Sequence, residues 1–284
     1  MTAAPGLAAR RAGRRGAEVL AGSAVLLALV AAAVLAPLLT HWDPTAVDLP
    51  HQHESGSAAH LLGTDHLGRD VLARVLYAGR TDLVVALGVT VASAVLGAGL
   101  GALCGWLRGP LPAVVLRLVD VVAAFPFLVL VLAVLAVTGP GLGGVLIAIP
   151  ATGWVSYTRL CRTEVLVLRE QGFVDAHRVL GLGGGRILLR HVLPHALGPC
   201  LVYSTTDFTG NLVLIAAVSY FGAGVQPPAP EWGAMIAEGQ HYLDRGWLPL
   251  VAATAAVVVA GLGASLLGDG LAHRLATPAA GDRG

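Results

Sequence analysis

The 284-residue sequence contains no lysine, so all 18 of its basic residues are arginine. This absence excludes an ATP site built on a P-loop lysine and any Schiff-base chemistry on this chain. Cysteine is scarce: Cys104, Cys161 and Cys200 lie far apart, so the spacing indicates neither a cysteine-only zinc site nor a disulfide framework. Charged residues make up only 12% of the chain and the net charge is +1, which gives no electrostatic argument for nucleic acid.

Hydrophobic residues are abundant instead, at 56% of the sequence, and the mean hydropathy is +0.75. Apolar runs of about 20 residues match the ~30 Å hydrocarbon core of a bilayer. Six such runs predict an all-α, polytopic membrane helix bundle with six transmembrane helices. They cover residues 19–39, 83–107, 118–138, 142–158, 199–221 and 247–267. Arginines precede the first run as in a signal peptide, but the length of that run favours an uncleaved membrane anchor.

The arginines also predict the orientation of the chain in the membrane. With both termini in the cytoplasm, fourteen arginines lie on the inner side and four on the outer side, as the positive-inside rule requires. The predicted divisions are a cytoplasmic N-terminal tail (1–18), a first transmembrane helix (19–39), an extracytoplasmic segment (40–82), a core with five transmembrane helices (83–268) and a cytoplasmic C-terminal tail (269–284). The two tails are expected to be poorly ordered.

Several residues inside the apolar runs predict how the helices pack. Gly97, Gly101 and Gly105 recur every four residues, so they share one helix face and predict the close approach of another helix. Pro126 predicts a kink in the third run.

Asp207 lies well inside the fifth run, with Asn211 one helical turn later. A charged residue at the centre of a membrane helix costs about 2.5–3.5 kcal/mol on the insertion scale. Such residues usually face a bundle interior or an aqueous path. Two roles stay open for Asp207: lining or gating a pathway, or a structural hydrogen bond with Asn211 or a neighbouring helix.

The cytoplasmic segment 159–198 is the longest inner loop and reads as helix, break, helix. Residues 162–180 have helical composition, the glycine-rich stretch 181–185 breaks the helix, and residues 186–193 resume a short helix that Pro194 is expected to stop. A short helix held between two membrane spans is a suitable lever for motion of a soluble partner. The simpler alternative is an ordinary basic inner loop.

This loop carries a resemblance to a known family. Asp175-Ala176-His177, then Gly181, then His191-Val192-Leu193-Pro194 follow the spacing of the EAA loop of permease subunits of bacterial ABC importers. Residues 60–70, 221–233 and 268–271 resemble segments of the C-type subunits of the dipeptide, oligopeptide and nickel class. The resemblance extends over about residues 20–277. One departure is that the usual Glu-Ala-Ala is Asp-Ala-His here, so a bulky, titratable side chain replaces a small one.

The resemblance implies one chain of a multi-subunit importer in the cytoplasmic membrane of a bacterium, not an enzyme, with no cofactor on this chain. Its partners would be a second permease subunit, two ATP-binding subunits and an extracytoplasmic solute-binding protein. The residues implied in coupling to the ATPases are Asp175, Ala176, His177, Gly181, Arg186, Leu193 and Pro194. The outer loop 222–246, with Gln226, Pro227 and Trp232, would contact the binding protein or form part of an outer gate.

Short peptides are the first substrate expectation, and nickel or a metal chelate is the alternative. Five of the ten histidines lie in the first outer segment, and imidazole is a good nickel ligand. They are His41, His51, His53, His60 and His66. A polar, solvated loop is the simpler explanation for them. In the same segment, residues 61–76 predict a salt-bridged surface helix with Thr64 as its N-cap and an Asp70–Arg74 pair.

Two other classes of function are disfavoured. The sequence lacks the HExxH spacing of a zinc protease and the G-x-S-x-G turn of a serine hydrolase, which argues against an intramembrane enzyme. A passive channel has no need for a helix on its inner face that ends at a glycine break.

Overall fold

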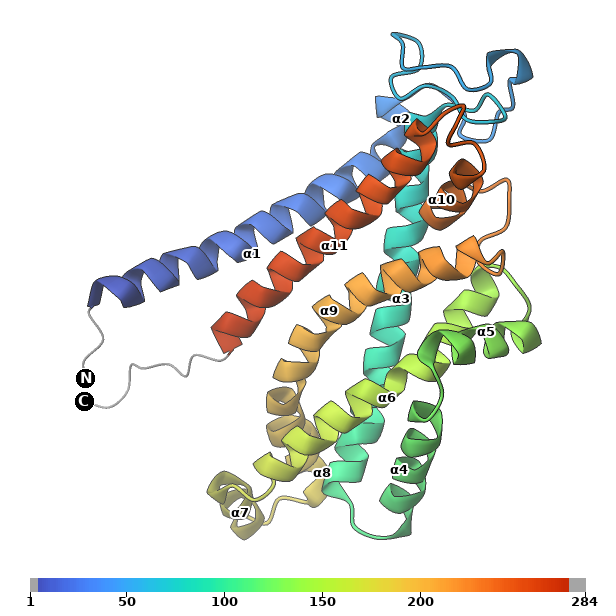
Figure 1. Ribbon diagram of the computed structural model, residues 1–284. Helices are drawn as coiled ribbons and strands as arrows, with labels where there is room; N and C mark the ends of the chain where they lie inside the picture. Colours follow the sequence, from blue (N-terminus) through green and yellow to red (C-terminus); the bar gives the residue numbers. More distant parts are fainter. Residues whose placement is uncertain (1–4, 276–284) are drawn as a thin grey trace.

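The computed structural model describes residues 5–275, and every regular element within them is helical (Figure 1). The long helices are α1 (Pro5–Val34), α3 (Val71–Trp106), α6 (Leu142–Leu168), α9 (Leu193–Tyr220) and α11 (Leu248–Leu275). The shorter helices are α2 (Ala36–Leu39), α4 (Pro110–Ala123), α5 (Phe127–Thr138), α7 (Gly172–Val179), α8 (Gly184–Ile187) and α10 (Trp232–Gln240). A 3₁₀ turn, η1 (Leu49–His51), and a π-helical turn, η2 (Leu188–Val192), complete the list. The predicted all-α class is confirmed.

Four helical stretches of the described chain are long and apolar enough to cross a membrane: Ala17–Val34, Val71–Trp106, Gly184–Tyr220 and Leu248–Ala272. The pair formed by α4 and α5 is a fifth candidate, bent by 99°. Helix α6 is long but is not among them, since its inner third carries Arg159, Arg162 and Glu164. A polytopic bundle is therefore supported, whereas six separate spans are not confirmed.

The third predicted run, 118–138, is two helices rather than one. Helix α4 ends at Ala123, and α5 begins at Phe127, directly after Pro126. Proline has no N–H to donate and disfavours the helical conformation in the residue before it. The predicted kink is confirmed, and it is so sharp that this run does not form one straight span.

Helices α3 and α6 lie against each other along most of their length, and the glycines of α3 explain why. A Cβ atom added at Gly101 would lie 2.6 Å from the carbonyl oxygen of Thr158, and one at Gly105 would lie 2.8 Å from Cβ of Val165. At Gly97 a Cβ would overlap the backbone of α6. The Thr158 hydroxyl donates to the Gly97 carbonyl at 3.1 Å. The predicted close approach on the glycine face is confirmed.

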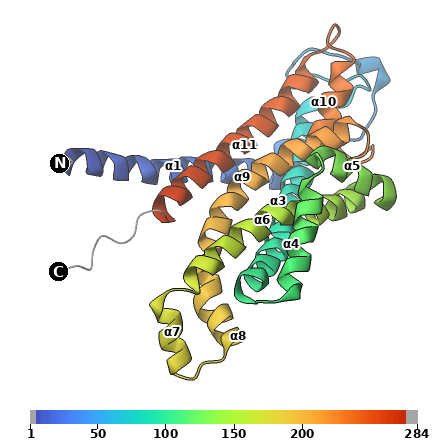
Figure 2. The ribbon, with the colours of Figure 1, turned by 60° about the horizontal axis from the view of Figure 1, so that its bottom comes forward.

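Helices α1 and α11 pack along each other and diverge from the α3–α6–α9 group (Figures 1 and 2). Glycine again allows the contact, because a Cβ at Gly22 would lie 2.7 Å from the Gly263 carbonyl oxygen. Helix α1 begins at Pro5 and α11 extends to Leu275, so both reach into the stretches expected to be tails. Residues 1–4 and 276–284 of those tails lie outside the described residues.

The main hydrophobic core joins α3, α6 and α9. Val89, Ile149 and Ile215 are nearly or fully buried in it, and they come from these three helices in turn. A second cluster lies toward α7 and contains Tyr157, Cys161 and Val174. The two clusters give the centre of the bundle a continuous interior that holds the polar residues described next in fixed positions.

Candidate functional site

Helix α7, which carries Asp175-Ala176-His177, projects from one end of the bundle (Figures 1 and 2). Val174 is its one buried residue in the described structure. On the exposed face of α7, Asp175 forms an ion pair with Arg178 at 2.7 Å. The apolar side chains of Val179 and Leu180 are 88% and 77% exposed. An exposed apolar tip beside charged residues is typical of a surface that another protein covers.

Gly181 ends α7 as predicted. Its φ is +78°, the left-handed conformation that glycine adopts without cost. The Gly181 N–H donates to the Arg178 carbonyl at 2.9 Å, and the Leu182 N–H donates to the His177 carbonyl at 3.1 Å. These bonds satisfy carbonyls that the helix end leaves free, so the turn after α7 is well defined.

The predicted stop at Pro194 is wrong. Helix α8, the π turn η2 and α9 follow one another in a single helical stretch from Gly184 to Tyr220. In the π turn the Leu193 N–H donates to the Leu188 carbonyl, five residues back. Pro194 comes immediately after this change of hydrogen-bond register, where a missing N–H is tolerated in a first helical turn. Exposed Arg186 and half-buried Leu193 lie on this stretch, so the isolated short helix is α7 rather than residues 186–193.

Aromatic side chains connect α7 to the start of α9. The imidazole rings of His177 and His191 have centroids 4.0 Å apart. Nδ1 of His177 donates to the Phe173 carbonyl at 2.6 Å, which fixes the ring. The Phe173 ring also lies 6.3 Å from that of His195. The histidine that departs from the Glu-Ala-Ala pattern therefore faces the bundle, while Asp175 and Ala176 are exposed.

A polar cluster lies between α3, α6 and α9 in the middle of the bundle. Asp207 Oδ2 accepts from the Tyr157 hydroxyl at 3.0 Å and from the Asn211 amide at 3.1 Å. The same Asn211 amide donates to the Thr90 hydroxyl at 2.9 Å, and Asn211 is buried. The structural hydrogen bonds expected for Asp207 and Asn211 are therefore present. The pathway role stays a prediction.

An apolar groove of about 910 Å³ runs beside this cluster. Helices α3 and α9 form most of its wall, and α1 and α11 supply the rest. Its polar lining is confined to a few side chains, namely Arg80, Thr90, Ser204 and Thr205, with the weakly polar thiol of Cys200 beside them. A surface this large and apolar needs either lipid or another protein chain to cover it.

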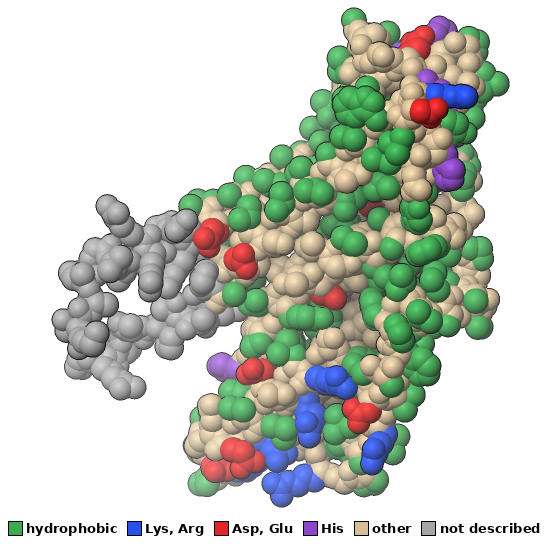
Figure 3. All heavy atoms as spheres, in the orientation of Figure 1, with side chains coloured by type: hydrophobic (Ala, Val, Ile, Leu, Met, Phe, Trp, Pro, Cys, Tyr) green, Lys and Arg blue, Asp and Glu red, His purple; other side chains and the backbone are tan. Residues whose placement is uncertain are grey.

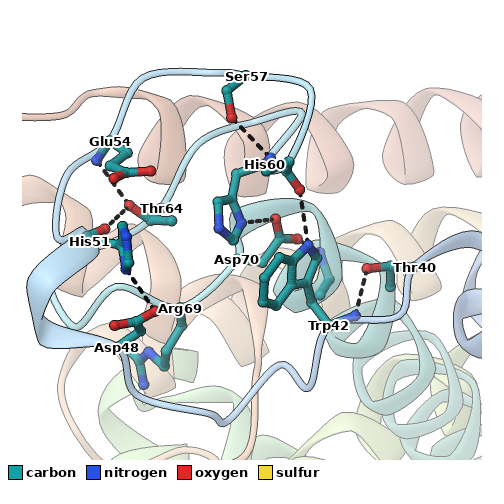
Figure 4. Close-up of polar contacts among 12 residues, drawn as sticks. Thr40, Trp42, Asp48, His51, Glu54, Ser57, His60, Thr64, Arg69 and Asp70 are labelled. Atoms are coloured by element: carbon teal, nitrogen blue, oxygen red, sulfur yellow. Dashed lines mark hydrogen bonds and ion pairs between the residues drawn. The ribbon is translucent and has the colours of Figure 1, made fainter.

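Of the predicted helix 61–76, only residues 71–76 are helical, as the start of α3, and residues 61–70 belong to a compact loop (Figure 4). His60 stacks on Trp42 with ring centroids 4.4 Å apart, and its Nδ1 donates to Asp70 at 2.9 Å. Asp70, not Thr64, caps α3, because its side chain accepts from the Ala73 N–H at 2.7 Å. Gly63 has φ +71° and interrupts any helix before that point.

Buried charges join this loop to α10. Asp65 accepts from Arg69 Nε at 2.7 Å and also pairs with Arg74. Glu238 of α10 pairs with the same two arginines, at 2.8 Å from Arg69 and 3.1 Å from Arg74. The predicted Asp70–Arg74 pair is replaced by this network. We call these four residues the outer charge network.

The outer histidines are engaged in the loop rather than gathered around an ion. Asp65, His66 and Glu238 lie close enough to be tested as metal ligands. Both oxygens of Asp65 are already used, since Oδ1 accepts from two backbone N–H groups and Oδ2 from the two arginines. A cation there would also face both guanidinium groups. The donor set therefore does not fit a metal, and nothing in this geometry favours nickel.

Burial shifts the pKa values of His66, which lies beside the outer charge network, and of Glu238, which belongs to it. Burial lowers the pKa of His66 below its ordinary value, although Asp65 and Glu238 oppose this shift. The His66 ring stacks on Tyr242 with centroids 4.8 Å apart. Burial likewise raises the pKa of Glu238, and Arg69 works against that change. By linkage, the lowered pKa of His66 disfavours the folded chain as the pH falls, and the raised pKa of Glu238 opposes this effect.

The last outer loop contains both surface and interior residues. Gln226 and Pro227 are exposed, and the Gln226 amide donates to the Gly224 carbonyl at 2.9 Å. Trp232 is only 3% exposed. Its backbone N–H donates to Asp82 at 2.9 Å, and its indole N–H donates to the Val75 carbonyl at 3.0 Å. Trp232 therefore anchors α10 to α3 and does not offer its ring to a partner.

Two residues of these clusters carry no advance signal in the sequence. Tyr157 has nothing in its neighbourhood to mark it as a partner of Asp207, which is 50 residues away. Glu238 lies 169 residues from Arg69. To find Tyr157 and Glu238 from the sequence, one would need to know which distant positions contact each other in the fold.

Comparison with known proteins places this geometry in context. The profile described as binding-protein-dependent transport system inner membrane component matches residues 97–277. A Brucella suis protein provisionally named as a peptide transport system permease is 37% identical over 93% of this chain and 89% of its own length. A di/tripeptide transport system permease protein of Pseudomonas aeruginosa is 35% identical over 90% and 86%. A glutathione transport system permease protein of Pectobacterium atrosepticum is 35% identical over 94% and 88%.

Proposed function

The chain belongs to the family of binding-protein-dependent transport system inner membrane components, and on that premise we propose that it is the permease subunit of an ATP-driven importer of short peptides. The observation that carries the proposal is the extent of the match to peptide permeases, which covers about nine-tenths of this chain. ATP is hydrolysed by separate subunits in this proposal. That division of labour agrees with the absence of lysine from the sequence.

Helix α7 is the proposed contact with the ATP-binding subunits. Its exposed face offers Asp175 and Ala176, and its tip offers Val179 and Leu180. Its inner face rests on the π turn η2 through His177 and His191, and on α9 through Phe173 and His195. A push on α7 would therefore reach α9 directly, and α9 carries Asp207 and Asn211 into the centre of the bundle. Gly181 and Arg186 lie between the two helices, and Leu193 and Pro194 are the first residues of α9.

Both termini are proposed to be cytoplasmic. Arginine side chains gather at the end of the molecule that carries α7 (Figure 3). This distribution is the one expected for the cytoplasmic side of a membrane protein. The first outer segment and α10 then lie outside, where exposed Gln226 and Pro227 are available to a solute-binding protein.

The second permease subunit is proposed to cover the apolar groove. In this proposal the partner closes the open side of the groove and leaves its volume of about 910 Å³ between the two subunits; the wall on this chain includes Val84, Val91, Val95 and Leu201. The two exposed helix faces on either side of it, on α1 and α3, carry further large apolar side chains. A heterodimer would bring a second wall to the pathway at Asp207.

Uptake of a labelled dipeptide tests the proposed function. Cells with and without the gene would be compared, together with deletion cells that carry the gene on a plasmid. We expect uptake to fall at least tenfold on deletion and to return on complementation. Unchanged uptake of di- and tripeptides in the deletion strain would contradict peptide import. Cellular nickel content, measured in the same strains, is expected to stay constant.

A further inference from the structure

We propose that Asp207 binds the ammonium group of the substrate in transit, with the N-terminus of a short peptide as its source. This inference rests on the proposed peptide import and deepens it. It assigns to one residue of this chain a direct contact with the transported molecule.

The two oxygens of Asp207 have different surroundings. Oδ2 accepts hydrogen bonds from Tyr157 and Asn211, at 3.0 and 3.1 Å. Oδ1 accepts no hydrogen bond from the described residues. It is also not one of the side-chain atoms that are buried without a hydrogen-bond partner. One oxygen therefore holds the carboxylate in place, and the other is left open to a ligand.

The hydrogen bonds to Oδ2 are themselves fixed by packing. Tyr157 is completely buried, and its ring packs edge-on against that of Tyr203 with centroids 4.9 Å apart. Asn211 is buried and is also held by Thr90. A binding group that is oriented in advance loses less entropy when its ligand arrives.

The carboxylate has no cation beside it. Within the described part of the chain, no arginine or histidine forms an ion pair with Asp207. Ionisable groups at membrane depth pair with an opposite charge or mark a substrate path. The missing positive charge is what a peptide supplies, since its ammonium group carries three N–H donors and no acceptor.

The cluster reaches the groove through Thr90. Thr90, at the end of the hydrogen-bonded chain from Asp207 through Asn211, lines the groove wall. Ser204 and Phe208 line it as well and flank Asp207 along α9. The lining includes no carboxylate, and its one charged side chain, Arg80, donates to the Ala33 carbonyl at 2.6 Å. Asp207 does not itself line the groove, but Ser204 and Phe208 beside it on α9 do, so its carboxylate is adjacent to the wall of an otherwise apolar route.

A purely structural role makes a different prediction. Asparagine at position 207 would keep a carbonyl oxygen to accept from Tyr157 and Asn211, and would replace the second, charged oxygen with a neutral NH2 group. If Asp207 is needed only for its hydrogen bonds, Asp207→Asn should be nearly silent and Tyr157→Phe should be as damaging as any change at 207. If it binds an ammonium group, Asp207→Asn should impair transport and Tyr157→Phe should impair it less.

The first experiment measures the charge at the site without any peptide. Ser204→Cys places a thiol three residues before Asp207, on a neighbouring position of the helix surface. In membranes that contain the complete transporter, with Cys104, Cys161 and Cys200 replaced by alanine, the thiol is treated with aminoethyl or sulfonatoethyl methanethiosulfonate. Asp207 should attract the first reagent and repel the second. We expect Asp207→Asn to lower the ratio of their rates about tenfold.

A matched control and two opposing outcomes decide the result. Val30→Cys, on the α1 side of the same groove, should show a ratio that Asp207→Asn leaves unchanged. An unchanged ratio for the thiol at position 204 would overturn the proposal. A thiol at 204 that even neutral methyl methanethiosulfonate does not reach would also overturn it, because the site would then be closed to ligands.

The second experiment identifies the source of the ammonium group. Reconstituted transporter is supplied with dialanine, N-acetyl-dialanine or N-acetyl-alanyl-lysine, each at a concentration that saturates the binding protein. We expect Asp207→Asn to reduce dialanine uptake about tenfold and to leave the two acetylated peptides unchanged. A loss shared by N-acetyl-alanyl-lysine would assign the site to side-chain ammonium groups as well. An equal loss for all three peptides would overturn the proposal in favour of a structural role.

The failure of this inference is distinguishable from failure of the proposed function. Wild-type transporter that takes up no peptide contradicts peptide import, whatever the reagents report at position 204. Wild-type transporter that takes up dialanine, together with an Asp207→Asn variant that does so equally well, contradicts only the ammonium site.

Discussion

At the outer end of the bundle, Arg69 and Arg74 bridge Asp65 and Glu238, so that two segments far apart in the sequence are joined by buried charges. At the opposite end, α7 rests on one buried residue, Val174, and on the ring contacts of His177 with His191 and of Phe173 with His195. A buried ion network has one acceptable geometry and a high cost of disruption. A helix with few buried contacts opens at low free energy.

From this difference we infer that the end of the bundle that carries α7 moves more easily than the outer end. The outer end keeps the first loop and α10 in one arrangement over the ends of the membrane helices. At the inner end α7 has one buried residue, so we expect α7 to shift against α9 at a lower cost than that of rearranging the outer end. In an importer driven from the cytoplasm, motion is needed at the end that contacts the ATP-binding subunits.

Removal of one arginine from the outer charge network has the largest expected effect. Arg74→Ala leaves Asp65 and Glu238 with one fewer partner in a buried setting, and breaking such a pair costs about 3–5 kcal/mol. We expect a much lower thermal midpoint in detergent and a lower yield of folded protein. Arg245→Ala is the control, because Arg245 is exposed in the same outer region and its loss should cost less than about 0.5 kcal/mol. Equal midpoints for the two variants would contradict the rigid outer end.

A side chain at Gly181 should affect the inner end alone. Gly181 has φ +78°, and a leucine in the left-handed region costs about 1–2 kcal/mol. We expect Gly181→Leu to reduce peptide uptake about five- to tenfold while its level in the membrane and its thermal midpoint stay close to wild type. Gly172→Ala, at the start of α7, is the matched control, since a Cβ there meets no atom within 4 Å. Normal uptake by Gly181→Leu would show that the turn does not transmit motion.

Mild acid should weaken the outer end slightly. The folded-state pKa of His66 is lowered by burial, so below the ordinary value of about 6.5 the unfolded chain binds a proton that the folded chain does not. The free energy of unfolding should therefore fall as the pH drops through this range. We expect the thermal midpoint to fall by a degree or two between pH 7.5 and about pH 6, and His66→Phe to reduce that slope. A slope that His66→Phe leaves unchanged would assign it to another group.

Replacement of Pro194 should have the smallest effect of all. Pro194 lies just after the π turn, where the helix does not require its N–H, and its side chain is exposed. We expect Pro194→Ala to change uptake by less than twofold and stability by less than about 0.5 kcal/mol. A strong loss of transport in this variant would show that the proline restrains the link between α7 and α9.

Local patterns in the sequence predicted the local features of the fold. The four-residue spacing of Gly97, Gly101 and Gly105 identified the face of α3 that meets α6, because the helical repeat is fixed by backbone geometry. Pro126 marked the break between α4 and α5 for a similar reason. Gly181 marked the end of α7. Each of these depends on one residue type at one place in the chain.

Features that depend on competition between positions were not predictable in the same way. Thr64 and Asp70 are both good N-caps, and the choice between them was decided by the positive φ of Gly63 and by the contact of Asp70 with His60. Pro194 was predicted to end a helix because the amino-acid composition does not reveal the π turn that precedes it, which allows the helix to continue through the proline. Glu238, a partner of Arg69, and Tyr157, a partner of Asp207, come from helices far away in the sequence.

The bend between α4 and α5 has a consequence for how the chain is made. The two helices have 14 and 12 residues, or about 21 and 18 Å, so neither crosses a hydrocarbon core of about 30 Å alone. Helix α4 packs on α3 and α6, and α5 packs on α6, which is synthesised after both of them. During biosynthesis this apolar stretch therefore leaves the ribosome before the helix that supports its bent form exists. We expect the bend to be acquired late, as a step of assembly within the membrane rather than of insertion into it.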